Sequence, residues 1–121
     1  MNKGRKKELE AMLHDYKNID FKLRTLDIHI DALLNDVCIF DAALTIEDLR
    51  QSKDKIIYFK ELIKNALSKL SEEEYKLIEL RYFQRNKKKW VEIGLILAMD
   101  KDYCCKKNKK ILEKIEQFLA N

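Results

Sequence analysis

The sequence contains no proline and only two glycines, Gly4 and Gly94. Proline and glycine mark most tight turns, so their scarcity argues against a fold of many short strands and hairpins. It favours long helices joined by short loops. Of the 121 residues, 46% are hydrophobic and 38% are charged, a balance close to that of globular proteins. These totals predict an all-α chain with one domain, or one domain and a helical extension.

Long apolar runs are missing as well. No stretch of about 18 apolar residues occurs, so we expect no transmembrane helix. The opening stretch, MNKGRKKELEAM, is basic but lacks the apolar segment of a signal peptide. The expected location is therefore the cytoplasm, and we expect no membrane partner.

The sequence has few residues that suit catalysis or metal binding. Its three cysteines, Cys38, Cys104 and Cys105, are an odd number, which argues against a disulfide framework. No CxxC motif accompanies them, and a zinc site needs about four ligands. His14 and His29 lie 15 positions apart on one predicted helix and cannot share a ligand within the chain. No nucleophile–base pair or glycine-rich phosphate loop is visible. We expect no enzyme, no cofactor and no metal.

Positive charge is concentrated in one segment. The net charge is only +4, but residues 81–110 carry ten basic residues and three acidic ones. Such asymmetry indicates a polyanionic partner, although a lysine-rich helix can also serve only to keep a protein soluble.

The first third of the chain has an apolar heptad stripe, which predicts one long helix over about 6–37. The stripe consists of Leu9, Met12, Tyr16, Ile19, Leu23, Leu26, Ile30, Leu33 and Val37. On the opposite side of this helix lie Phe21, Ile28 and Ala32. Two apolar faces on one helix suggest that one packs within the chain and the other meets a partner. We therefore expect a homodimer, although which face dimerises stays open.

A second helix is predicted over about 45–69. Thr45 can cap its N-terminus, and Glu47 and Asp48 suit the first turn. We favour an antiparallel hairpin of 6–37 with 45–69, joined through CIFDAAL, over a first helix that pairs only with its own copy. Both arrangements can hold at once.

A third helix, predicted over about 72–85, opens with a capping box. Ser71 is followed three residues later by Glu74, so each side chain can bind the other's backbone N–H. Leu77, Ile78, Leu80 and Tyr82 supply its buried positions.

The last third has the layout of a helix-turn-helix. A short helix over about 90–98 is followed by a turn and then by a basic helix that Asp100 caps and that runs to about Leu119. Gly94 is the small residue expected at the close approach of the two helices, and Cys104 is expected to face inward. Residues 1–69 are thus predicted as a dimerisation or partner-binding region and 70–121 as a DNA-binding domain.

The candidate DNA contacts face outward from this motif. They are Lys101, Tyr103, Cys105, Lys106, Lys109 and Lys110 on the basic helix, Lys87, Lys88 and Lys89 before the short helix, and Arg81 and Arg85 near the end of the capped helix. Lysines can contact phosphates or guanine edges. Trp90 is interpreted as a core anchor, with stacking near the DNA backbone as the alternative.

Two positions depart from the usual pattern of the motif. Lys107 stands where an apolar residue is common, and Ala98 stands where the turn usually has glycine. Ala98 is acceptable only if it avoids a positive φ or tolerates some strain.

The segments LSEEEYKLIELRYF and WVEIGLILAMDKDYCCKKNKKILEKI resemble region 4 of bacterial sigma factors. The residues that carry this resemblance are Leu80, Arg81, Tyr82, Glu92, Ile93 and Gly94. The resemblance covers about 70–116, less than half of the chain. A counterpart of sigma region 2 is absent, which argues against an initiating sigma factor.

The layout of the whole chain is similar to phage transcription activators of the RinA/ArpU type, through the run RYF…KW.EIG…L…D…C..KNKK.LEKI. This resemblance implies a regulator of late phage genes in a bacterial host, with double-stranded DNA and RNA polymerase as partners. Two alternatives stay open: a small terminase-like DNA-packaging subunit, and a helical adaptor that binds polymerase without touching DNA.

Overall fold

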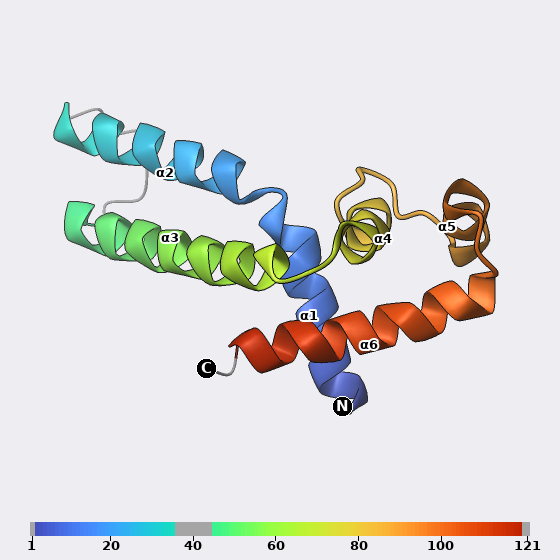
Figure 1. Ribbon diagram of the computed structural model, residues 1–121. Coiled ribbons are helices and arrows are strands. Elements are labelled where there is room, and N and C mark those ends of the chain that lie inside the picture. Colours follow the sequence, from blue (N-terminus) through green and yellow to red (C-terminus); the bar gives the residue numbers. More distant parts are fainter. Residues whose placement is uncertain (1, 36–44, 120–121) are drawn as a thin grey trace. The chain divides into compact units, whose positions relative to one another are not determined.

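The computed structural model of the protein describes residues 2–35 and 45–119. Within these ranges every regular element is an α-helix (Figure 1), which confirms the predicted all-α class. The helices are α1 (Lys3–Tyr16), α2 (Ile19–Leu34), α3 (Ile46–Ser68), α4 (Glu72–Tyr82), α5 (Trp90–Leu97) and α6 (Lys101–Leu119).

The single helix predicted over 6–37 is wrong, because the chain turns at Lys17 and Asn18. The N–H of Lys17 binds the carbonyl of Asp15, and Asn18 leaves the helical region with φ −96° and ψ 4°. Asparagine has a low helix propensity and favours helix ends, so it separates α1 from α2. The heptad spacing continues across this turn and therefore hides it. Val37 and the CIFDAAL connection lie outside the described residues.

The chain divides into two compact units, Met1–Lys17 with Leu62–Asn121, and Asn18–Glu61. We call the first the four-helix unit, after α1, α4, α5 and α6, and the second the hairpin unit, after α2 and most of α3. This division does not coincide with the predicted boundary between residues 69 and 70, because α1 contacts α4 and α6.

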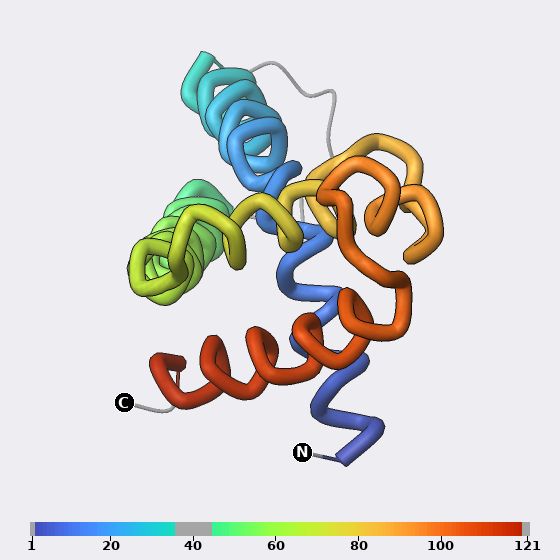
Figure 2. The backbone as a smooth tube through the Cα atoms, turned by 45° about the vertical axis from the view of Figure 1, so that its right-hand side comes forward, coloured from blue at the N-terminus to red at the C-terminus, as the bar shows by residue number. Residues whose placement is uncertain are grey.

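The four-helix unit has a continuous apolar core. Its helices contact one another in the pairs α5–α6, α4–α5, α4–α6, α1–α4 and α1–α6, and Figure 2 shows α1 crossing α6. The buried apolar side chains are Leu9, Leu13, Ile63, Ala66, Leu67, Leu77, Ile78, Leu80, Tyr82, Ile93, Cys104, Ile111, Leu112 and Ile115. These side chains come from α1, the end of α3, α4, α5 and α6. The removal of their apolar surface from water is the main contribution to the stability of the unit.

The predicted capping box at the start of α4 is confirmed. The Ser71 N–H donates to Glu74 Oε1 at 2.8 Å, and the Glu74 N–H donates to Ser71 Oγ at 3.2 Å. All four predicted core positions of α4 are buried. The helix ends at Tyr82, three residues before the predicted end.

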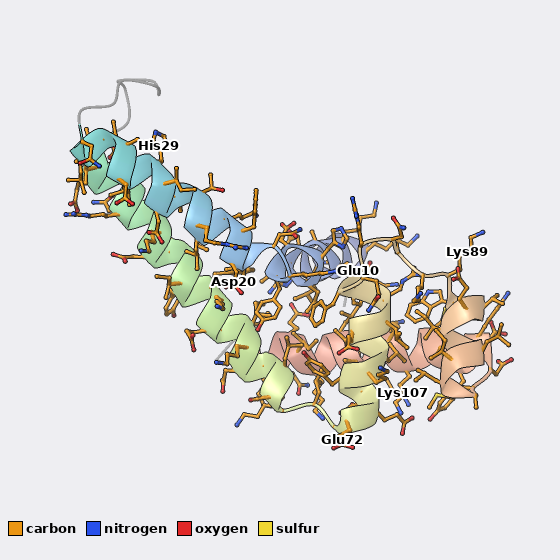
Figure 3. All side chains as sticks on the ribbon, turned by 90° about the horizontal axis from the view of Figure 1, so that it is seen from above. Glu10, Asp20, His29, Glu72, Lys89 and Lys107 are labelled. Carbon is orange, nitrogen blue, oxygen red and sulfur yellow. The ribbon has the colours of Figure 1, made fainter. Side chains whose placement is uncertain are left out.

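The hairpin unit holds α2 and α3 side by side in opposite directions. Lys60 Nζ pairs with Asp20 at 2.7 Å, and Lys53 Nζ pairs with Asp27 at 2.6 Å, so the order of the partners along α3 reverses that along α2. Figure 3 labels Asp20 on α2, in the hairpin unit. Thr45 caps α3 as predicted, since its Oγ1 accepts from the Asp48 N–H at 3.1 Å.

Candidate nucleic-acid interface

The segment predicted as a helix-turn-helix consists of α5, residues 98–100 and α6. Gly94 is buried at its centre, and a Cβ atom on this residue would lie 2.6 Å from the carbonyl oxygen of Met99. Real Cβ atoms do not come this close to a backbone oxygen, so any larger residue would push the turn away. Gly94 therefore allows the close approach that the sequence predicted.

The turn contains one strained residue. Ala98 has φ 56° and ψ 44°, the left-handed conformation that glycine adopts most easily. Its position after Leu97 makes it the C-terminal cap of α5, where glycine is usual. The sequence left open whether Ala98 avoids a positive φ or accepts strain. The structure has the positive φ and therefore the strain.

The inner face of α6 is fixed by packing. Cys104, Ile111, Leu112 and Ile115 are fully buried, and their spacing places them on one side of the helix. The Asp100 carboxylate accepts from the Asp102 N–H at 3.1 Å, which confirms the predicted cap. Burial raises the pKa of the Cys104 thiol, which favours its neutral form.

The outer face of α6 is basic and open. Lys101, Cys105, Lys106, Lys109 and Lys110 are all exposed, and none of these four lysines forms an ion pair with a described residue. Because the opposite side of α6 is buried, these charges stand on a helix that cannot easily rotate. Tyr103, also exposed, lies at the edge of this face.

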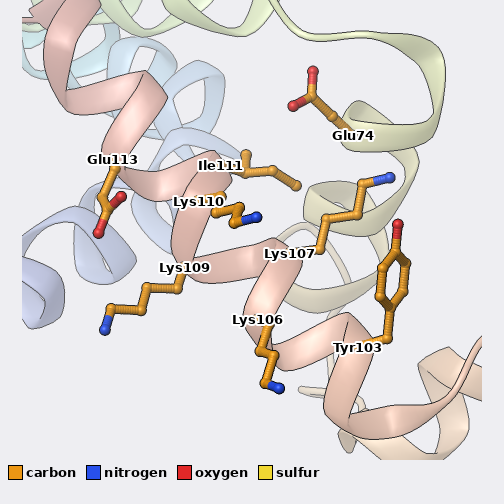
Figure 4. A pocket seen from close by; sticks show the side chains of 8 residues that line it. All are labelled: Glu74, Tyr103, Lys106, Lys107, Lys109, Lys110, Ile111 and Glu113. Carbon is orange, nitrogen blue, oxygen red and sulfur yellow. The ribbon is translucent and has the colours of Figure 1, made fainter.

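A hollow of about 540 Å³ lies beside these lysines, between α6 and the N-terminal part of α4 (Figure 4). It is lined by Glu74, Tyr103, Lys106, Lys107, Lys109, Lys110, Ile111 and Glu113. In Figure 4 the Lys107 side chain extends along α4 next to the Tyr103 ring, whereas Lys106 and Lys109 point away from α4. The lysines of α6 thus divide into a group that faces α4 and a group that faces outward.

Lys107 and Lys114 belong to the group that faces α4. Lys107 pairs with Glu73, and Lys114 Nζ pairs with Glu74 at 3.0 Å. The hydrogen bond to Glu73 raises the pKa of Lys107. The pKa of Glu74 is lowered, first by the Ser71 N–H and also by Lys114. The lysine that departs from the usual apolar pattern at 107 is therefore used to join α6 to α4.

Arg81 is held inside the unit and does not project from it. Its guanidinium lies 4.3 Å from the centre of the Trp90 ring, and its Nη1 donates to the Lys88 carbonyl at 2.5 Å. Cation–π stacking of this kind stabilises a tryptophan at a partly buried site. Trp90 is half-buried, in line with its interpretation as an anchor, and the pair fixes the loop that leads into α5.

The remaining predicted contacts lie in that loop. Arg85, Lys87 and Lys89 are exposed, and Lys88 is half-buried. A second hollow, of about 440 Å³, is lined by Arg85 and Lys87 together with Arg81, Tyr82, Asn86 and three residues of α1, Glu10, Ala11 and His14. The structure therefore brings these loop cations together beside α1, separately from the hollow on α6.

A buried polar network was missed by the sequence reading. Tyr82 Oη lies 2.9 Å from Glu10 Oε2 and 2.9 Å from Asn108 Nδ2. The hydroxyl has one proton, so it donates to the Glu10 carboxylate and accepts from the Asn108 amide. Burial raises the pKa of Tyr82, which keeps the hydroxyl protonated. The network joins α1, α4 and α6. Its signal in the sequence was Asn108, four residues after the inward Cys104.

Among residues 2–35 and 45–119, no group of three or more His, Cys, Asp or Glu side chains is placed to hold a metal ion. Cys105 is exposed next to the buried Cys104, and Cys38 lies outside these ranges. In the same part of the chain, no helix has the length and apolar character needed to cross a membrane.

Comparison with known proteins gives no assignment. The chain matches no protein-family model, no curated protein and no solved structure. The resemblance to sigma region 4 and to the RinA/ArpU type accordingly rests on the quoted residues alone.

Proposed function

We propose that the protein is a sequence-specific DNA-binding regulator of transcription that inserts the N-terminal half of α6 into the major groove. The observation that carries this proposal is the two-sided character of α6. One side is locked into the core, while the other presents Lys101, Lys106, Lys109 and Lys110 without ion-pair partners among the described residues. A recognition helix requires this combination of a fixed inner face and an open basic outer face.

In this account the outward-facing lysines of α6 and the cations around the loop before α5 have different tasks. Lys106 and Lys109 contact phosphates or guanine edges, and each contact releases counterions from the DNA. Arg81 acts indirectly, because its stacking on Trp90 and its bond to the Lys88 carbonyl hold the loop. The fixed loop then offers Lys87 and Lys89 to the DNA backbone next to the groove.

The resemblance to RinA/ArpU-type proteins adds a biological setting to this proposal. It supports an activator of phage late genes that acts in the host cytoplasm and contacts RNA polymerase. Genome-wide mapping of bound DNA in cells that carry the phage tests this setting. Binding upstream of late genes supports it, whereas binding at a packaging site supports the small-terminase alternative.

Affinity for duplex DNA tests the proposed contacts directly. Lys106→Ala and Lys109→Ala, combined, are expected to weaken binding roughly tenfold or more, because two phosphate or base contacts are lost. The matched control is Lys55→Ala with Lys64→Ala, which removes the same charge from exposed positions of α3. Equal weakening by both pairs would show that net charge, and not the face of α6, determines binding.

One observation favours a second candidate, a protein-binding adaptor. The short helix α5 exposes Val91, Leu95 and Ile96, and Leu95 is 80% exposed. Apolar side chains gathered on one short helix are typical of a protein contact. An adaptor would keep its partner when Lys106 and Lys109 are replaced and would lose it on Leu95→Asp. Absence of any salt-dependent affinity for duplex DNA would favour the adaptor over the regulator.

A further inference from the structure

Helix α2 carries two apolar faces, and the structure shows which of them is used inside the chain. The heptad face, with Leu23, Leu26 and Ile30, is half-buried or buried. The ion pairs of Asp20 with Lys60 and of Asp27 with Lys53 run along this side and hold it against α3. The part of the heptad stripe that lies on α2 is therefore covered within the hairpin unit and is not available as the main contact to another chain.

The other face of α2 remains open to solvent. Phe21 is 67% exposed and Ile28 is 65% exposed, although both are large apolar side chains. They lie seven residues apart, so they fall on one side of the helix, and the half-buried Ala32 lies on the same side. The three span 11 steps of 1.5 Å, a stripe of about 17 Å, which is long enough for a helix–helix contact.

We propose that a second copy of this chain covers the outer stripe, with the two α2 helices antiparallel about a two-fold axis near Ile28. Such an axis places the two Ile28 side chains together. With this axis, residues whose numbers sum to about 56 face each other, so Phe21 lies over the end of the partner's α2 and Arg24 lies opposite the partner's Ala32 and Asp31. An isologous contact of this kind is the commonest basis of a soluble dimer.

The charges beside the stripe argue for a second copy over an unrelated protein. Arg24 and Asp31 are seven residues apart on one edge of the stripe, and both are exposed. Neither forms an ion pair within 4 Å with a described residue of its own chain, although, after the larger effect of Lys60, the charge of Arg24 also helps to lower the pKa of Asp20. The two-fold axis brings Arg24 opposite the partner's Asp31, and it does so twice. This self-complementary pattern is expected for a contact between identical helices.

The small size of the hairpin unit also favours a second copy of the chain as the partner of the outer stripe. Asn18–Glu61 is a pair of helices with few buried apolar side chains, namely Ile19, Ile30 and Leu49 among its described residues. A segment of this size rarely covers its apolar surface alone. Two hairpins joined through α2 form a four-helix assembly that does so more completely. The inference does not depend on DNA binding.

The mass of the full chain in solution, measured by sedimentation equilibrium over a range of concentrations, tests the proposal. The wild-type protein is expected to be a dimer, and Ile28→Glu is expected to raise the dimer dissociation constant at least tenfold. Leu95→Glu on α5 is the matched control, because it adds the same charge to a more exposed apolar residue and should leave the dimer intact.

A charge reversal tests the antiparallel orientation without disturbing the apolar stripe. Arg24→Asp and Asp31→Arg should each weaken the dimer, because each variant places like charges opposite one another. The combined variant Arg24→Asp with Asp31→Arg should restore it. A monomeric wild-type protein, a ring of many subunits, a dimer unaffected by Ile28→Glu, or no rescue by the double reversal would each overturn the proposal.

Discussion

The two units of this protein bury their apolar surface to very different degrees. The four-helix unit closes a core around Ile93, Leu112 and Ile115 and exposes mainly the apolar residues of α5. The hairpin unit leaves large apolar side chains such as Phe21, Ile28 and Tyr58 in solvent. Apart from the apolar residues of α5, the four-helix unit closes its core within the chain, while the hairpin unit buries only Ile19, Ile30 and Leu49 among its described residues.

Our proposals assign the two units different tasks along one chain. The proposal that α6 reads DNA requires a helix in a fixed orientation, and burial of the inner face of α6 provides it. The proposal that α2 joins two subunits requires an apolar face that stays exposed in the single chain, and Phe21 and Ile28 provide it. In our proposals, the closed unit binds DNA and the open unit joins two copies.

The largest expected difference between the units concerns truncation of an apolar side chain. Leu112→Ala should destabilise the protein by about 3 kcal/mol, because it leaves a cavity in a closed core. Leu26→Ala, at a half-buried position of α2, should cost only about 1 kcal/mol, because the site is already partly solvated. Urea denaturation of both variants measures the contrast. Equal losses would mean that the hairpin unit is as tightly packed as the four-helix unit.

A smaller difference in the loss of stability is expected between variants of the two N-terminal caps, at Glu74 of α4 and at Asp48 of α3. Glu74 caps α4 and also pairs with Lys114, whereas the Asp48 carboxylate binds only the Thr45 N–H among the described residues. Glu74→Gln should therefore cost about 1 to 2 kcal/mol, and Asp48→Asn about 0.5 kcal/mol. Thermal denaturation at neutral pH compares the two variants, and a larger loss for Asp48→Asn would contradict the assignment.

Glu74 also makes the stability of the protein depend on pH in the acidic range. The folded-state pKa of Glu74 is lowered, so its contribution is complete above the unfolded-state pKa, near 4.3, and is lost as the pH falls through the folded-state value. Stability measured from pH 6 downward should fall less steeply in Glu74→Gln than in the wild type. Parallel curves for the two proteins would show that Glu74 does not contribute to the acid dependence.

A small gain in stability is expected at the strained turn of the four-helix unit. Ala98→Gly should stabilise the protein by roughly 0.5 to 1 kcal/mol, because glycine adopts a positive φ without steric cost. The same substitution at Ala11, an exposed position inside α1, should destabilise it by about 1 kcal/mol. Differential scanning calorimetry should show midpoints that move in opposite directions. A loss of stability in both variants would mean that Ala98 is not strained.

Local signals in the sequence predicted several features of α4, α5 and α6 well. The capping box at Ser71, the cap at Asp100, the close approach at Gly94 and the inward Cys104 all depend on residues within a few positions of each other. Such features follow from helix periodicity and cap chemistry, which a single sequence displays.

Features that depend on distant residues were predicted poorly. The pairing of Lys107 with Glu73 joins positions 34 apart, and the hydrogen bond from Tyr82 to Glu10 joins positions 72 apart. The turn at Asn18 was missed for a different reason, since the apolar spacing on both sides of it stays in phase. As a result, α1 was assigned to the hairpin, although its Leu9 and Leu13 are buried in the four-helix unit.

The salt dependence of DNA affinity tests the central claim most directly. We expect a plot of log K against log salt concentration with a slope of about −5, because the four exposed lysines of α6 together with Lys87 and Lys89 each contribute about −0.9 when they contact a phosphate. Lys106→Ala with Lys109→Ala should reduce the magnitude of this slope by about 2, whereas Lys55→Ala with Lys64→Ala should not change it. A slope near zero in the wild type, or one unchanged by the α6 variant, would contradict the assignment of α6 as the DNA-binding helix.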